Sequence, residues 1–176
     1  MLAYLIKDML DTLRYLPDLV VAAFAVMLVV LVVNVVRRIR GKEPLPPISS
    51  TFFCTYVIAI LFITFLSRES GTRQGFDLEI GSTWAINDRN KAYVIENVLL
   101  FVPFGFLAAL RIPAMRNFFT SIVWGILFSW GIECMQLITQ RGYFQLDDIL
   151  TNGLGTVIGL ILYTLAHGIL KKKEVS

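Results

Sequence analysis

Residues 19–36 read LVVAAFAVMLVVLVVNVV, a stretch of eighteen residues with no formal charge and a single amide side chain, Asn34. A helix rises about 1.5 Å per residue, so a stretch of this length nearly crosses the ~30 Å hydrocarbon layer of a membrane. Four other stretches are similarly long and carry few charges. The sequence therefore predicts an all-α fold, a polytopic membrane helix bundle whose five spans cover residues 19–36, 48–67, 93–110, 117–138 and 149–170.

The composition of the whole chain also indicates a membrane protein. Of its 176 residues, 56% are hydrophobic and 16% are charged, and the mean hydropathy is +0.70. Because a water-soluble domain of this size cannot bury so much apolar surface, residues 1–176 are predicted to form a single membrane domain. This excludes a soluble enzyme, a disordered chain, a disulfide-linked secreted module and a nucleic-acid-binding protein. Cys54 and Cys134 fall at different depths and are not expected to pair.

The first eighteen residues have the pattern of an amphipathic helix. Apolar residues recur at helical spacing, at Leu2, Leu5, Ile6, Met9, Leu13 and Leu16. Charged residues lie between them, and a helix of this kind is typical of a segment that lies in the membrane interface. Residues 1–18 are therefore predicted to form an interfacial amphipathic helix. The alternative is a frayed extension of the first span.

Five spans place the two termini on opposite sides of the membrane. The loops after spans one and three and the carboxyl-terminal tail hold nine Lys and Arg residues, whereas the segments on the other side hold seven. Positively charged loops stay preferentially in the cytoplasm. The sequence therefore predicts an amino terminus outside the cell and a carboxyl terminus in the cytoplasm. Nine acidic residues fall in the segments predicted to lie outside.

Polar side chains in and beside the last three spans gather at the outer edge of the predicted bilayer. An ionisable group in hydrocarbon is costly, so such residues mark functional sites or contacts inside the bundle. We therefore predict a ligand-binding site formed by four acids, one arginine and three amides. Its residues are Glu96, Asn97, Glu133, Gln136, Arg141, Asp147, Asp148 and Asn152.

Helical spacing indicates the face on which these residues lie. In the fourth span small residues and one acid recur every four positions, and two glutamines continue the stripe: Ser121, Gly125, Ser129, Glu133, Gln136 and Gln140. In the fifth span Asn152, Gly155 and Gly159 share one face. Membrane helices approach closely along small residues, so the polar residues of these stripes are predicted to point into the bundle. Pro103 leaves the carbonyl of Leu99 free and allows a kink in the third span.

Structural roles are alternatives for several charged residues. Glu96 and Glu133 could form ion pairs with Arg141 or another outer arginine that fasten the helix ends. Asp147 or Asp148 could be the N-cap of the last span, because a carboxylate there accepts hydrogen bonds from free backbone N–H groups. Only one of the two aspartates can occupy the cap position.

The polar set is compatible with more than one ligand chemistry. Gln136 and Asn152 could simply hydrogen-bond between helices. The carboxylate and amide oxygens could hold Mg²⁺ or Ca²⁺, and Arg141 could bind a phosphate or sugar headgroup. The sequence assigns no metal ligand and no cofactor.

The segment 67–92 between spans two and three is long and patterned. It is predicted to lie outside the membrane and to close over the carboxylates as a lid, with Arg68, Glu69, Arg73 and Trp84 as its main contact residues. Its aromatic residues would anchor it at the interface. The alternative is a solvated loop whose arginines rest on lipid phosphates.

Three motifs together resemble a known family. ENVLLFVPFGF at residues 96–106, ECMQ at 133–136 and DDILTNGLG at 147–155, with Arg141 between the last two, are similar to the VanZ-like family of bacterial integral membrane proteins. The motifs fall in the family's order within residues 93–170, the predicted motif core. The resemblance maps the family's motif residues onto the eight residues of the predicted site.

The resemblance implies a multi-pass protein of the bacterial plasma membrane that lowers susceptibility to teicoplanin-type glycopeptide antibiotics. The leading hypothesis is an outward-facing polar pocket that binds membrane lipids, a lipid-linked cell-wall intermediate or the lipoglycopeptide itself. A second is a membrane-embedded enzyme in which Glu133 or Asp148 is the general base. A third is a non-catalytic scaffold. The oligomeric state is left open.

Overall fold

The computed structural model describes residues 1–66, 68–71 and 75–175. Its helices are α1 (Leu2–Thr12), α2 (Leu16–Ile39), α3 (Pro47–Leu61), α4 (Ser82–Ile86), α5 (Asp88–Arg111), α6 (Phe118–Ile138) and α7 (Leu146–Val175). The strands β1 (Phe76–Asp77) and β2 (Phe144–Gln145) form a short parallel pair. A 3₁₀ turn, Leu13–Tyr15, joins α1 to α2, a π-helical turn, Phe62–Leu66, extends α3, and a second 3₁₀ turn, Pro113–Arg116, precedes α6.

Five helical stretches among the described residues are long and apolar enough to cross a membrane. They are Leu2–Ile39, Pro47–Leu66, Asp88–Arg111, Phe118–Ile138 and Leu146–Leu170. Each contains most of one predicted span, so the structure confirms the all-α class and the multi-pass membrane bundle. Ser67, the predicted end of the second span, lies outside the described residues.

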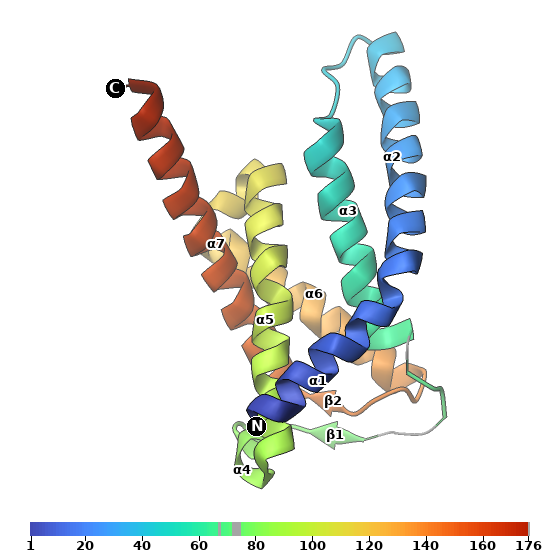
Figure 1. Cartoon of the computed structure of the whole chain (residues 1–176), viewed down its shortest axis with the longest axis vertical. Coiled ribbons are helices and arrows are strands. Elements are labelled where there is room, and N and C mark those ends of the chain that lie inside the picture. Colours follow the sequence, from blue (N-terminus) through green and yellow to red (C-terminus); the bar gives the residue numbers. More distant parts are fainter. Residues whose placement is uncertain (67, 72–74, 176) are drawn as a thin grey trace.

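The amino-terminal helix α1 is an element of its own. It crosses α5 diagonally before the chain turns at Leu13–Tyr15 and rises as α2 (Figure 1). Most of its apolar side chains are exposed. The predicted amphipathic helix is therefore present, and its place in the membrane interface stays a prediction.

The two helices α2 and α3 form a hairpin that is closed by Asn34. The amide of this residue donates to the carbonyl oxygen of Leu45 (2.9 Å) and accepts from the backbone N–H of Leu45 (2.7 Å). A side chain that pairs with both backbone groups of one loop residue fixes the loop, which is rich in proline and cannot form a helix. The only amide in the most apolar span thus holds the turn that follows it.

Close packing in the bundle centres on α7, which lies against α5 and α6. The α5–α7 pair is the most extensive of the helix contacts. A Cβ atom added to Gly105, Gly155 or Gly159 would collide with the backbone of the facing helix, and one added to Gly125 would lie 2.5 Å from Thr156 Oγ1. Small residues permit this approach, as predicted from their stripes.

The stripe of polar residues on α6 also points inward. Ser121, Ser129, Glu133 and Gln136 are buried, which confirms the predicted face. Gln140 does not continue the stripe, because α6 ends at Ile138 and Gln140 is exposed in the left-handed region (φ 56°). The chain leaves the helix before the next turn is complete.

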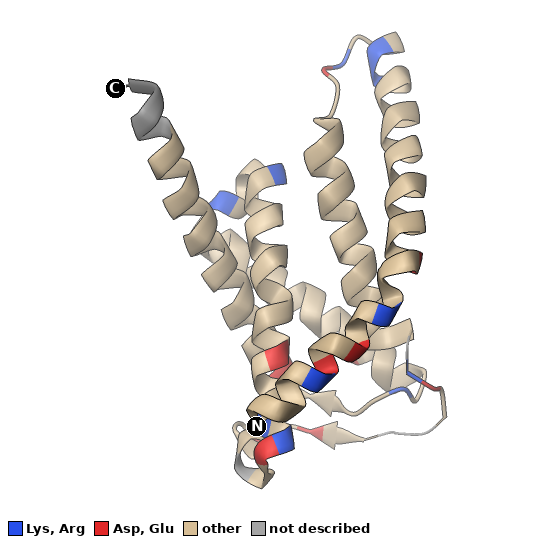
Figure 2. Cartoon of the chain, viewed as in Figure 1, with Lys and Arg blue, Asp and Glu red and all other residues tan. Residues whose placement is uncertain are grey.

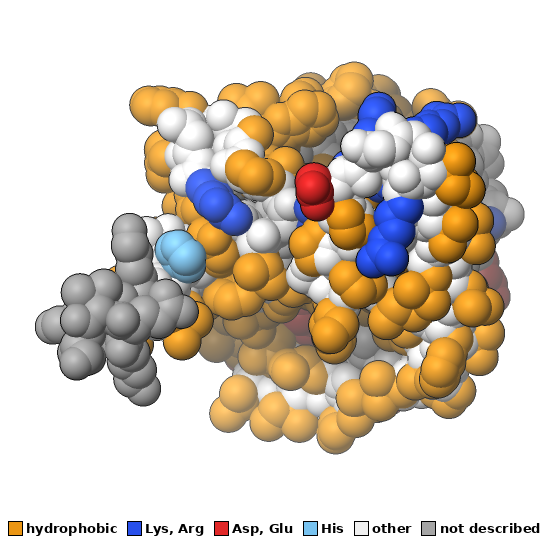
Figure 3. All heavy atoms as spheres, turned by 90° about the horizontal axis from the view of Figure 1, so that it is seen from above, with side chains coloured by type: hydrophobic (Ala, Val, Ile, Leu, Met, Phe, Trp, Pro, Cys, Tyr) orange, Lys and Arg blue, Asp and Glu red, His pale blue; other side chains and the backbone are white. Residues whose placement is uncertain are grey.

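The two ends of the bundle differ in charge. Most of the acidic residues lie at the end that carries α1, α4, β1 and β2, called here the polar end (Figure 2). The charged side chains seen on the opposite end are mostly basic, and hydrophobic side chains surround them (Figure 3). The uneven charge predicted from the loops is therefore present in the fold.

Candidate functional site

The π-helical turn at the end of α3 is held by side chains from α6 and the loop after it. Gln136 Nε2 donates to the carbonyl oxygen of Thr64 (2.9 Å). Arg141 Nη1 donates to the carbonyl oxygens of Phe65 (3.2 Å), Leu66 (3.2 Å) and Arg68 (3.0 Å). The last carbonyls of a helix have no partner within the helix, and leaving them unpaired in hydrocarbon is costly. Both predicted site residues therefore supply bonds that α3 lacks.

Arg141 does not form the ion pairs that the sequence allowed. Neither Glu96 nor Glu133 pairs with Arg141 in the described structure. Its guanidinium lies over the ring of Phe65, 4.9 Å from the centroid. Arg141 thus fastens the end of α3 through backbone carbonyls.

A second arginine, Arg68, contacts the side chain of Gln136. Arg68, an exposed residue just beyond the π-helical turn, donates from Nη1 to Gln136 Oε1 at 3.2 Å. Gly142 lies against this contact, because a Cβ atom there would be 2.6 Å from Gln136 Oε1 and 3.0 Å from Arg68 Nη1. The glycine thus provides the space in which Arg68 and Gln136 meet.

Asp147 binds the start of α4 and is not the N-cap of its own helix, α7. Its two carboxylate oxygens accept from the backbone N–H groups of Gly81 (2.7 Å) and Thr83 (3.0 Å). The N-cap predicted for the last span is wrong, because α7 begins at Leu146 and both aspartates fall in its first turn. Asp147 instead satisfies the free N–H groups at the amino end of another helix.

The strands β1 and β2 complete the attachment of the segment after α3. Phe76 pairs with Phe144 and Asp77 with Gln145, and the backbone N–H of Phe144 donates to Gly75 (2.9 Å). The described residues of this segment, 68–71 and 75–86, are called here the cover, and they are attached to the bundle through Arg68, through β1 and through the start of α4.

Glu133 and Asp148 are charged neighbours at the polar end. Glu133 is 2% exposed, and its Oε2 accepts from the backbone N–H of Gln145 at 2.9 Å. Its charged neighbours are Asp148 and Arg68. Asp148 has the same arginine as a neighbour, and the Asn97 amide lies within hydrogen-bonding reach of its carboxylate. Side chains of α5, α6 and α7 and the side chain of Arg68 thus interact electrostatically at this end.

Glu96 and Asn152 have different surroundings. The charged neighbours of Glu96 are Asp8 of α1 and Arg89, so this acid faces the amino-terminal helix. Asn152 is 4% exposed and donates from Nδ2 to Ser129 Oγ at 2.8 Å, a bond between α7 and α6. The geometry thus divides the eight predicted residues into three sets: those that bond backbone groups, those that contact another helix, and the group around Glu133.

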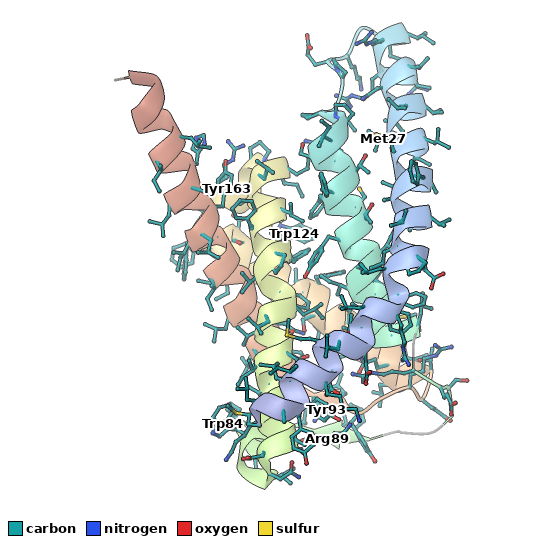
Figure 4. The ribbon with its side chains drawn as sticks, in the orientation of Figure 1. Met27, Trp84, Arg89, Tyr93, Trp124 and Tyr163 are labelled. Atoms are coloured by element: carbon teal, nitrogen blue, oxygen red, sulfur yellow. The ribbon has the colours of Figure 1, made fainter. Side chains whose placement is uncertain are left out.

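The predicted lid residues are only partly described. Arg68 bonds Gln136 as above, Glu69 is exposed, and Arg73 lies outside the described residues. Trp84 is on α4 and lies at the polar end, as Tyr93 and Arg89 do (Figure 4). Arg89 Nε donates to the Tyr93 hydroxyl at 2.6 Å.

Several contacts at this end could not be found from the sequence. The backbone groups of Thr64, Gly81, Thr83 and Gln145 are partners of the site, and a backbone N–H or carbonyl has no signal in a sequence. Gly142, a glycine between the second and third motifs, could have indicated that two segments approach closely there. Among the described residues no group of three His, Cys, Asp or Glu side chains is placed to hold a metal ion.

Comparison with known families shows to which family the chain belongs. The VanZ/LLP1 family model matches residues 53–167, from α3 through most of α7. The chain belongs to the VanZ/LLP1 family. The matched range includes all eight residues of the predicted site and the whole cover.

Within this family, the chain is similar to Protein VanZ of Enterococcus faecium. The two sequences are 29% identical over 82 residues, which are 47% of this chain and 50% of that protein. The alignment thus spans only half the length of its curated VanZ relative. No solved structure matches the chain.

Proposed function

We propose that this VanZ/LLP1 protein lowers the susceptibility of a bacterium to teicoplanin-type lipoglycopeptides by binding an anionic envelope lipid headgroup at its polar end. In this proposal the protein lies in the plasma membrane, and the polar end and the amino terminus face outward. Residues 67–92 act as the lid of the headgroup site. The phenotype is the one that resemblance to VanZ-like proteins implies.

The position of Arg68 is the observation that supports a headgroup site most directly. Arg141, the other arginine of the site, is engaged with three carbonyl oxygens. Arg68 is exposed and lies beside Glu133, Asp148 and Gln136. A guanidinium at the edge of a buried acidic group matches a ligand that carries a phosphate next to hydroxyl groups. Arg68 binds the phosphate, and Asp148 and Asn97 bind the hydroxyls.

A lipid titration tests this assignment. The purified full chain in detergent is titrated with short-chain phosphatidylglycerol, and with phosphatidylcholine for comparison. Removal of one charge-assisted contact corresponds to about a tenfold rise in Kd, which we expect for Arg68→Gln with phosphatidylglycerol. Arg38→Gln, an exposed arginine at the opposite end, is the matched control and leaves the Kd unchanged. Equal affinities for wild type and Arg68→Gln would contradict a headgroup site at this arginine.

An enzyme is the second candidate, and the proximity of Glu133 and Asp148 favours it. Two neighbouring carboxyl groups in a buried site are suited to take up and release a proton. The chain would then convert a lipid-linked substrate, with Glu133 or Asp148 as the general base. Purified protein supplied with envelope lipids and Mg²⁺ should form a product that Glu133→Gln does not form. If the folded wild type converts no lipid, the enzyme hypothesis fails.

A further inference from the structure

We infer that an apolar pocket between α3 and α6 holds one acyl chain of an anionic phospholipid whose phosphate lies at Arg68. This inference rests on the proposed function and extends it, because it names the class of ligand and the place of its hydrocarbon part.

The pocket lies next to the proposed headgroup site at Arg68. It has a volume of about 520 Å³ and is lined by Leu61, Phe65 and Leu66 of the α3 end and by Gly131, Ile132 and Met135 of α6, with two further residues of α6. Leu61, Leu66 and Met135 are exposed although their helices are predicted to cross the membrane. A volume of this size is typical of pockets that take small ligands and is too small for a further helix.

The wall formed by α3 is fixed in place. The carbonyl oxygens of Phe65 and Leu66 accept from Arg141, and that of Thr64 accepts from Gln136. The guanidinium of Arg141 also covers the ring of Phe65. Because these bonds connect the π-helical turn to α6 and its loop, the protein's own contacts hold this wall, which needs little ordering to bind a ligand.

Gly131 keeps the pocket open on the α6 side. A Cβ atom added there would meet nothing within 4 Å, unlike one added to the glycines that pack helix against helix. Glycine is an unfavourable residue in a helix, and helix packing does not require it here. The missing side chain leaves space that a hydrocarbon chain can occupy.

The polar rim of the pocket identifies the amphiphile. Arg68 follows the lining residue Leu66 by two positions and hydrogen-bonds Gln136, which follows the lining residue Met135, so both polar residues stand next to the lining in the chain. An acyl chain in the pocket therefore has its phosphate beside a guanidinium. This charge complementarity favours an anionic phospholipid over a zwitterionic one.

Photocrosslinking tests the pocket. The full chain is reconstituted in nanodiscs with phosphatidylglycerol that carries a diazirine in one acyl chain, and labelled peptides are mapped. We expect labelling at the end of α3 and at residues 127–135 of α6. Gly131→Leu fills the pocket and should lower this labelling about tenfold, because the chain loses its dispersion contacts with the walls. Gly168→Leu, at a glycine of α7 that also has open space around it, should label as wild type does.

Photocrosslinking also tests whether the phosphate lies at Arg68. Arg68→Gln should abolish the preference for phosphatidylglycerol over phosphatidylcholine labelled in the same way. Unchanged labelling of the α3–α6 site in Gly131→Leu would overturn the inference. A dimer that forms in wild type and is lost in Gly131→Leu would also overturn it, because a second copy would then occupy the pocket. Drug susceptibility is measured in cells and labelling in nanodiscs, so failure of the proposed phenotype is distinguishable from failure of the pocket.

Discussion

At the scale of single residues, the charged side chains of the polar end contact backbone groups more than one another. Arg141 donates to three carbonyl oxygens and Asp147 accepts from two backbone N–H groups. All five groups belong to the cover or to the end of α3. These two charges therefore hold the cover and the end of α3 on the bundle.

Loss of Arg141 should destabilise the protein. The carbonyl oxygens of Phe65, Leu66 and Arg68 would lose a charged donor, and because two of these bonds are exposed, Arg141→Gln is expected to lower the free energy of unfolding by about 1 kcal/mol. Thermal unfolding of the purified protein in detergent measures this. Arg38→Gln, at an exposed arginine, should change stability by less than about 0.5 kcal/mol. A fully stable Arg141→Gln variant that fails to bind lipid would instead place Arg141 in the headgroup site.

The neighbouring aspartates should respond differently to the same substitution. Asp147→Ala removes the acceptor of the Gly81 and Thr83 N–H groups, and hydrogen exchange across α4 should become faster. Asp148→Ala, one residue further along α7, should leave exchange in α4 near the wild-type rate. Equal exchange in the two variants would mean that Asp147 does not hold the cover.

The sequence identified these residues more reliably than it identified their partners. Depth and helical face selected Gln136, Arg141 and Asp147 because an apolar helix displays its few polar residues clearly. The sequence predicts a carboxylate or a ligand beside Arg141 and the N–H groups of its own helix beside Asp147, whereas the structure pairs Arg141 with carbonyl oxygens at the end of α3 and Asp147 with N–H groups at the start of α4. These groups belong to the end of α3, to Arg68 and to the start of α4, and nothing in a loop sequence specifies which carbonyl lies against which arginine.

At the scale of helices, glycines determine how closely α7 packs on α5. A Cβ atom at Gly159 would collide with the carbonyl oxygen of Val102, whereas one at Gly168 would meet nothing. Overpacking costs about 1–3 kcal/mol, so Gly159→Ala should lower the stability of the bundle. Gly168→Ala should keep it or raise it by up to about 1 kcal/mol, because alanine is the better helix former. Unfolding in mixed detergent compares the pair, and equal stability would argue against close α5–α7 packing.

Helices were predictable and short elements were not. The five spans follow from long apolar stretches, which only a helix can satisfy in hydrocarbon. The two-residue strands depend on a pairing between segments far apart in the chain, and no periodicity exists over two residues. Gln140 shows a similar limit, since the spacing of α6 continues in the sequence after the helix has ended at Ile138.

At the scale of the whole molecule, charge distinguishes the two ends, and this supports an outward polar end. The prediction is tested with single cysteines in a Cys54→Ser, Cys134→Ser background. Ile80 of the cover is 72% exposed, and Lys42 in the α2–α3 loop is also exposed. A membrane-impermeant maleimide applied to intact cells should label Ile80→Cys and not Lys42→Cys. The reverse pattern would place the polar end in the cytoplasm.

We propose that Glu133, the buried acid that has Arg68 as a charged neighbour, belongs to a site which changes drug susceptibility. The most direct measurement is the teicoplanin susceptibility of a sensitive bacterium that expresses wild type, Glu133→Gln or Glu79→Gln at equal membrane levels. Glu133→Gln keeps the shape of a side chain that is 2% exposed and removes its charge, whereas Glu79 is an exposed acid at the same end. We expect reduced susceptibility with wild type and Glu79→Gln, and loss of that protection with folded Glu133→Gln. Full protection by Glu133→Gln would mean that the charge of Glu133 is not needed and would indicate a scaffold.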